Sequence, residues 1–108
     1  MEYINYNGRT MTTGEVKKGD IIKFADSDYI ALGDSIERED VFGTIQTLFV
    51  EHYGEVILFA SCEQEDMPWW PCDGWEELET IDSLNEIAER CNVQLTVDND
   101  GYLKATTK

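Results

Sequence analysis

The sequence predicts a small α+β domain: a mainly antiparallel β-sheet or a partly open barrel, with one α-helix and a C-terminal hairpin. Three observations predict it. Residues 42–60 read as two strands around a tight turn, residues 83–92 space their apolar side chains as a helix does, and residues 93–105 alternate apolar and polar residues around a glycine. A chain of 108 residues supports one core, so we expect a single domain over residues 1–108.

The N-terminal segment predicts a tight hairpin. Two short runs, residues 3–6 and 9–12, flank the dipeptide Asn7-Gly8. This dipeptide tolerates the positive φ angles that a two-residue type I′ turn demands. We therefore expect the two runs to pair as antiparallel strands.

Residues 16–24 place a turn at Gly19 ahead of a β-branched run. Their V-x-x-G-D pattern, from Val16 to Asp20, resembles the turn-then-strand segment of SH3-like and related small barrels. The resemblance covers nine residues and implies a barrel strand here. Residues 28–32 then predict a short strand that Gly33-Asp34 closes.

The strongest hairpin signal comes from residues 44–51 and 55–60, which flank Tyr53-Gly54. A two-residue loop there fixes the register of the strands. The apolar pairs that follow are Leu48 with Phe59, Phe49 with Leu58, and Val50 with Ile57. Successive pairs lie on opposite faces, so both faces are apolar. Such a strand pair belongs at the centre of a sheet, with other elements covering each face.

One segment clearly predicts a helix. Ser83 to Glu86 has the pattern of a capping box, and Asn92 can close the helix. The apolar residues at helical spacing are Leu84, Ile87, Ala88 and Cys91. Cys91 is therefore expected to face the core, which weakens a redox or metal role for it.

The last segment predicts a hairpin in which Val93, Leu95 and Val97 face one side. A three-residue loop with a left-handed Gly101 sets Val97 opposite Leu103 and Leu95 opposite Ala105. Asp98 to Gly101 also opens like a calcium loop. The glycine lies at the fourth position of that motif rather than the sixth, so we interpret the segment as a plain turn.

The net charge of −15 comes from 23 acidic and 8 basic side chains that are unevenly distributed. Residues 1–25 sum to +1 and residues 83–108 to −1. The segment from Asp26 to Asp82 holds 16 acidic residues against Arg38 alone, and so accounts for the whole net charge. The acidic clusters there are residues 26–28, 37–40, 63–66 and 73–79.

This charge argues against direct binding to DNA, RNA or an anionic membrane, because each of these needs lysine and arginine opposite phosphates. A solvated surface that serves solubility is one interpretation. Solubility, however, needs a net charge of only about 2 to 8 in magnitude in a small domain. Like charges on one face also destabilise a fold, so we favour the interpretation that the field holds or steers a basic partner.

Residues 61–80 predict a long irregular loop, and loops of that length are usually functional or disordered. The segment is an acidic insertion with all three tryptophans and seven acidic residues. In one interpretation the indoles fold back and plug one open end of the sheet. In the other, Trp69 and Trp70 stay partly exposed and anchor a basic partner. Trp-rich loops with carboxylates also stack on sugars, so carbohydrate binding is a further alternative.

Catalysis and metal binding find little support in the sequence. Three cysteines and His52 offer ligands, but no C-x-x-C or H-x-x-x-H pair exists, so we expect reduced thiols and no metal. There is no P-loop, G-x-G-x-x-G or G-x-S-x-G motif, and His52 has no nucleophile at motif spacing. We therefore expect no enzymatic activity and no cofactor.

The expected compartment is the cytoplasm. No run approaches the roughly 20 apolar residues that span a bilayer, and the N-terminus lacks the basic and apolar regions of a signal peptide. We accordingly expect no membrane partner.

In charge asymmetry and small size, the chain resembles the acidic phage-encoded inhibitors that imitate nucleic acid, such as anti-CRISPR and anti-restriction proteins. The resemblance covers composition alone. It implies that carboxylates occupy the basic channel of a nucleic-acid-binding protein and block it. The alternative is a small ligand- or peptide-binding regulatory module whose pocket the tryptophans line. The residues expected at the partner contact are Glu37, Glu39, Asp40, Glu63, Glu65, Asp66, Trp69, Trp70, Asp73, Glu76 and Glu77.

Overall fold

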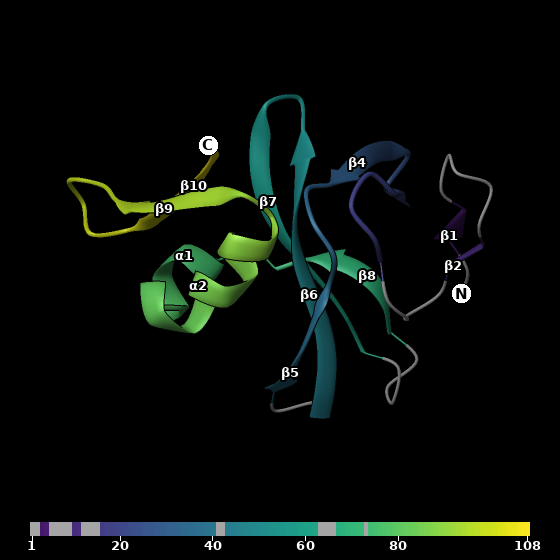
Figure 1. The fold of residues 1–108 in the computed structure, drawn as a ribbon, viewed down its shortest axis with the longest axis horizontal. Coiled ribbons are helices and arrows are strands. Elements are labelled where there is room, and N and C mark those ends of the chain that lie inside the picture. The colour runs from purple at the N-terminus through teal and green to yellow at the C-terminus, as the bar shows by residue number, and fades with distance from the viewer. Residues whose placement is uncertain (1–2, 5–9, 12–15, 41–42, 63–66, 73) are drawn as a thin grey trace.

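A computed structural model of the chain describes residues 3–4, 10–11, 16–40, 43–62, 67–72 and 74–108. It confirms the α+β class: a strongly curled, mostly antiparallel sheet, two helices and a C-terminal hairpin (Figure 1). The strands are β1 (Tyr3–Ile4), β2 (Thr10–Met11), β3 (Ile21–Phe24), β4 (Ser27–Ala31), β5 (Ile36–Asp40), β6 (Gly43–His52), β7 (Glu55–Cys62), β8 (Met67–Pro71), β9 (Val93–Val97) and β10 (Leu103–Thr107). The helices are α1 (Trp75–Leu78) and α2 (Ile81–Arg90).

The main sheet has the order β3-β4-β6-β7-β8, and β5 also pairs with β6. Its two edges, β3 and β8, come back into contact with each other, so the sheet curls into a half-barrel. The pairs β1–β2 and β9–β10 form two separate small ladders. In Figure 1 the β9–β10 hairpin projects from one side of the main sheet, above the two helices.

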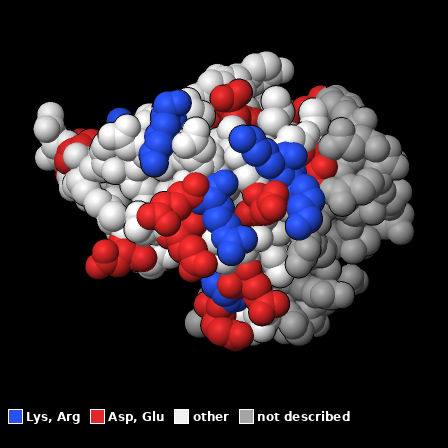
Figure 2. All heavy atoms as spheres, viewed as in Figure 1, with Lys and Arg blue, Asp and Glu red and all other residues white. Residues whose placement is uncertain are grey.

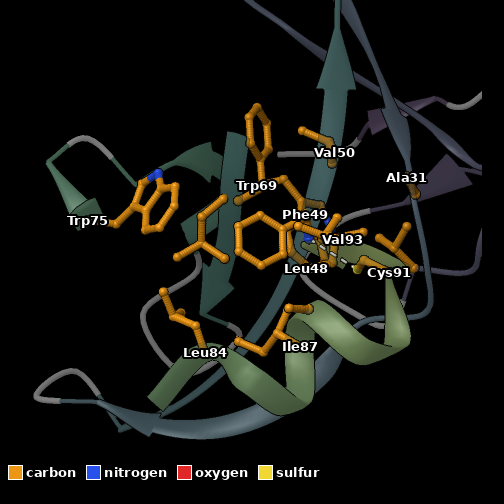
Figure 3. Packing of buried hydrophobic residues seen from close by; sticks show 14 of the residues in the cluster. Ala31, Leu48, Phe49, Val50, Trp69, Trp75, Leu84, Ile87, Cys91 and Val93 are labelled. Carbon is orange, nitrogen blue, oxygen red and sulfur yellow. Dashed lines mark hydrogen bonds between the residues drawn. The ribbon is translucent and has the colours of Figure 1, made fainter. Parts of the chain in front are cut away.

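The β6–β7 hairpin has the predicted register, with Leu48 opposite Phe59 and Phe49 opposite Leu58. All four of these side chains are at most 1% exposed. On one face the ring of Phe59 lies among other aromatic rings, 4.7 Å from that of Tyr29. The other face is covered by the helices, as Figure 3 shows for α2. The prediction that other elements cover both faces of this strand pair is confirmed.

Helix α2 buries the predicted apolar stripe, but it begins earlier than the sequence suggested. The stripe residues Leu84, Ile87, Ala88 and Cys91 are all at most 2% exposed. The predicted capping box at Ser83 is wrong, because Thr80 is the N-cap and Ser83 occupies its third helical position. Thr80 Oγ1 accepts from the Ser83 N–H at 3.2 Å, and Ser83 Oγ accepts from the Thr80 N–H at 3.0 Å. Asn92, with φ 54°, follows the helix in the left-handed region.

Residues 61–80 are more regular than the predicted loop. The structure places strand β8 and the one-turn helix α1 in this segment. Strand β8 contains two prolines, and these are tolerated because β8 is an edge strand that, among the described strands, pairs only with β7.

The two terminal hairpins differ in how well the sequence predicted them. The C-terminal register is confirmed, with Val97 opposite Leu103, and Gly101 has φ 86°. At the N-terminus β1 and β2 pair, but Tyr3 lies opposite Met11, one residue from the register that a two-residue turn would set. The predicted turn residues, Asn7 and Gly8, lie outside the described residues.

Gly33 sets the distance between the main sheet and the end of α2. A Cβ atom at this position would lie 2.2 Å from the carbonyl oxygen of Arg90 and 2.7 Å from the Cα atom of Cys91. Both contacts are with backbone, which cannot rotate away as a side chain can. Any larger residue must therefore push the helix terminus off the sheet.

We predict that Gly33→Ala destabilises the fold by about 1 to 3 kcal/mol, the usual cost of overpacking. Urea denaturation followed by circular dichroism measures this loss. Asn85→Ala on the exposed side of α2 is the control and should unfold close to the wild-type midpoint. A Gly33→Ala protein as stable as wild type would contradict the close approach.

Candidate functional site: an acidic groove beside the C-terminal hairpin

A groove of about 950 Å³ lies between the tip of the β6–β7 hairpin, the end of β8, helix α1 and strand β10. We call it the acidic groove. Its lining is apolar in part, and includes Val56, Ile57 and Leu103. The charged residues that line it are Glu55, Glu76, Glu77, Asp98 and Lys104.

Local backbone geometry places the three glutamates around the groove. Glu55 follows a type I′ turn whose central residues, Tyr53 and Gly54, have φ angles of 49° and 85°. Glu76 and Glu77 lie in the first turn of α1. The preceding residue, Trp75, is only 9% exposed and packs edge-on against Phe49, with ring centroids 5.7 Å apart. Burial of this indole fixes α1 on the sheet, so the two glutamates that follow it line the groove.

The groove keeps a net negative charge after its ion pair is counted. The Lys104 Nζ atom lies 3.9 Å from Asp98 Oδ2, which balances one acid with the one base among the described lining residues. The other three carboxylates, on Glu55, Glu76 and Glu77, make no ion pair within the described part of the chain. A ligand with two or three positive charges would therefore complement the lining.

Asp98 also organises the turn at the far end of the hairpin. Its Oδ1 atom accepts hydrogen bonds from the N–H groups of Asp100 and Tyr102 at 2.9 and 3.0 Å. The carboxylate thus stabilises a plain hairpin turn, as the position of the glycine predicted.

The tryptophans serve mainly as core residues. Trp69 is fully buried and Trp75 nearly so, whereas Trp70 is half-buried against a small cluster around Ile45 and Ala60. Trp69 is therefore not a surface anchor, and that prediction is wrong. Neighbouring side chains of β8 point to opposite faces of the sheet, so only one of the pair enters the main core. Trp75, which was not predicted as a contact, borders the groove.

The acidic residues predicted at the contact do not all meet. Glu76 and Glu77 line the groove. Glu37 and Glu39 are exposed on β5, which pairs with the end of β6 far from the hairpin tip (Figure 1). The backbone of Asp40 ends β5, and the remaining predicted acids lie outside the described residues: Glu63, Glu65, Asp66 and Asp73. Glu55 and Asp98 were not predicted from the sequence, because these two residues come together at the groove only when the last hairpin packs against β7.

Positive charges reduce the acidic field on parts of the surface. Figure 2 shows lysine and arginine side chains interspersed with aspartate and glutamate over one face. Lys23 pairs with Asp28 at 2.8 Å, and Arg38 of β5 pairs with Glu79 just after α1. The uncompensated carboxylates of the groove thus differ from several other acids of the central segment.

Metal ligands do not gather among the described residues, and His52 is held by its neighbours. Within the described part of the chain, no three His, Cys, Asp or Glu side chains come together in a way that could hold a metal ion. The His52 ring stacks on Tyr29 with centroids 4.3 Å apart, and its Nδ1 atom lies 3.0 Å from the carbonyl oxygen of Asp28. These contacts give His52 a role in holding the β6–β7 hairpin against β4.

Cys91 is a buried thiol at the end of α2. Burial raises its pKa, the hydrogen bond donated by the Phe49 N–H to Sγ opposes this, and the negative charge of Asp34 adds to the rise. Figure 3 shows this bond at the contact between the helix and β6. The reactive thiolate is therefore disfavoured at neutral pH.

The chain was compared with protein families, curated proteins and solved structures. No protein-family model matches it, and neither a curated protein nor a solved structure does so. Among the described residues, no helix has both the length and the apolar character needed to cross a bilayer.

We predict that Cys91 resists alkylation in the native protein. Its raised pKa and its burial both slow the reaction with iodoacetamide, by about a hundredfold or more relative to the protein unfolded in urea. Peptide mass mapping after timed labelling measures the rate, and the half-buried Cys72 provides the comparison. Equal rates for Cys91 in the native and unfolded protein would contradict this account.

Proposed function

We propose that the protein is a non-enzymatic acidic inhibitor that binds a basic nucleic-acid-binding protein and blocks its DNA or RNA channel by charge mimicry. The observation that carries the proposal is the acidic groove, where three carboxylates without ion pairs among the described residues adjoin an apolar wall. The resemblance to anti-CRISPR and anti-restriction proteins, which rests on composition, points to the same class of partner.

The net charge supports this function through its energetic cost. A charge of −15 on 108 residues repels itself and destabilises the compact state. A basic surface would relieve that repulsion on binding, so the free energy lost in the free protein is recovered in the complex. Carboxylates also form bidentate hydrogen bonds with arginine, the residue that basic channels use against phosphates.

The inhibitory step is competition for the channel. A DNA or RNA strand and the acidic protein would both need the same lysines and arginines, so occupation by one excludes the other. The mechanism requires no bond to be made or broken, which agrees with the absence of catalytic motifs in the sequence.

A second candidate function is a small ligand- or peptide-binding regulatory module. One observation favours it: Tyr29 and Tyr102 border the acidic groove beside the nearly buried Trp75 and offer aromatic surface to a ligand. Binding that rests on aromatic contact depends little on salt, whereas binding that rests on charge depends on it strongly. The two functions are therefore separable by one titration.

We predict that binding to a basic nucleic-acid-binding partner weakens at least about tenfold between about 50 and 200 mM salt. Capture from host cells identifies the partner. Titration of the purified pair by calorimetry then gives the affinity, and competition with the partner's own DNA or RNA tests the blocked channel. Salt-independent binding would favour the regulatory module. So would a partner that binds its nucleic acid and this protein at the same time.

Reversal of the groove charge should weaken the complex more than the same reversal elsewhere. We predict that Glu76→Lys with Glu77→Lys reduces affinity for the purified partner at least about tenfold, because two attractive contacts become repulsive. The matched control is Glu37→Lys with Glu39→Lys, which changes the net charge equally on β5, away from the groove. Equal losses from the two double variants would contradict a contact centred on the groove.

A further inference from the structure

The acidic groove is bordered by the edges of two strands as well as by side chains. Four consecutive residues of β10, 103–106, line it, and so do three consecutive residues of β7, 55–57. Side chains alternate between the two faces of a strand, so a groove that touches consecutive residues must meet the strand along its edge. Main-chain N–H and C=O groups therefore border the groove.

The edge of β10 that faces away from β9 carries unused pairing positions. Within the described strands, β10 pairs only with β9. The Asp98 N–H donates to the Tyr102 carbonyl at 2.9 Å, and the Lys108 N–H donates to the Asn92 carbonyl at 3.2 Å. Hydrogen-bonded pairs alternate along an antiparallel ladder, so the even-numbered residues of β10 bond to β9. The odd-numbered ones, including Leu103 and Ala105, direct their main-chain groups outward.

The same alternation applies at the tip of β7. The two-residue turn makes His52 and Glu55 a hydrogen-bonded pair, so the main-chain groups of Val56 and Leu58 point away from β6. The outward carbonyl group of Leu58 already accepts a hydrogen bond from the Cys72 N–H at 2.8 Å. Strand β8 ends at Pro71, so Val56 lies beyond the last residue that β8 pairs.

We propose that an extended, basic segment of the partner protein binds in the acidic groove by adding a strand to the free edge of β10. This inference rests on the proposed function and specifies the form of the partner's contact. Main-chain hydrogen bonds to Leu103 and Ala105 supply affinity, and alternate side chains of the added strand reach one face. Lysine or arginine at those alternate positions meets Glu55, Glu76 and Glu77.

Charge decides between the two occupants that could pair with this edge. A second copy of the chain would also offer a free β10 edge, but it would bring another −15 into contact with an acidic lining. A basic segment instead neutralises the three carboxylates of the groove. The complementarity therefore favours a heterologous basic strand over self-association.

The first experiment uses a fluorescein-labelled ten-residue peptide of alternating lysine and threonine as the probe. Fluorescence anisotropy in low salt should show that it binds the wild-type protein, whereas alternating glutamate and threonine does not bind. A third peptide keeps the lysines but is N-methylated at every residue, which removes its main-chain donors. It should bind at least about tenfold more weakly, because strand addition needs those donors.

The second experiment blocks the strand edge in the protein. Ala105→Pro removes an outward N–H from β10 without removing a hydrogen bond to β9, and should weaken binding of the lysine peptide at least about tenfold. The matched control is Val97→Pro on the outer edge of β9, in the same hairpin, and should bind as wild type does. Circular dichroism checks that both variants fold. If Ala105→Pro does not fold, the N-methylated peptide still tests the inference on the wild-type protein.

The outcomes separate the inference from the proposed function. One outcome is binding that depends on salt and yet is unaffected by both N-methylation of the peptide and Ala105→Pro. That result overturns strand addition but is consistent with charge mimicry. A wild-type protein that binds neither the lysine peptide nor any basic nucleic-acid-binding protein overturns both. Analytical ultracentrifugation measures whether the wild-type protein is a dimer. If it is, and if Ala105→Pro dissociates it, the β10 edge pairs with a second copy of the chain and the inference is overturned.

Discussion

The β6–β7 hairpin is apolar on both faces, and this constraint determines how the rest of the chain is arranged. Phe49 and Leu58 on one face, and Leu48 and Phe59 on the other, must all leave water. The curl of the sheet buries one face, because it brings aromatic rings of β3 and β4 over Phe59. The helices satisfy the other face, so the burial of Phe49 also decides where α1 and its glutamates lie.

Local patterns predicted most of the fold correctly, because short-range rules control those elements. The register of β6–β7 follows from a two-residue turn, and that of β9–β10 from a left-handed Gly101. The helix stripe follows from the 3.6-residue period. The start of the helix was predicted three residues too late, because Ser83 has the pattern of an N-cap but occupies the third helical position after Thr80.

The site was only partly predictable, because it forms where segments distant in sequence pack together. Glu76 and Glu77, which were predicted as contacts from charge and Trp content, line the groove, whereas Glu55 and Asp98 reach it through contacts between β7 and β10. Trp69 illustrates the opposite error. Its acidic neighbours suggested exposure, but pairing of β8 with β7 turns its indole into the core, where a large apolar side chain stabilises more than it would at the surface.

Free strand edges normally promote aggregation, and proteins protect them with charge, short length or a covering element. Here the edge of β10 lies beside the carboxylates of Glu55, Glu76 and Glu77, which make no ion pair with a described residue. The same charges that keep two copies of the chain apart also favour approach of a basic chain. If the proposed basic segment binds here, one arrangement keeps copies of the chain apart and selects a basic chain, so the large net charge and the edge that no described strand pairs act together.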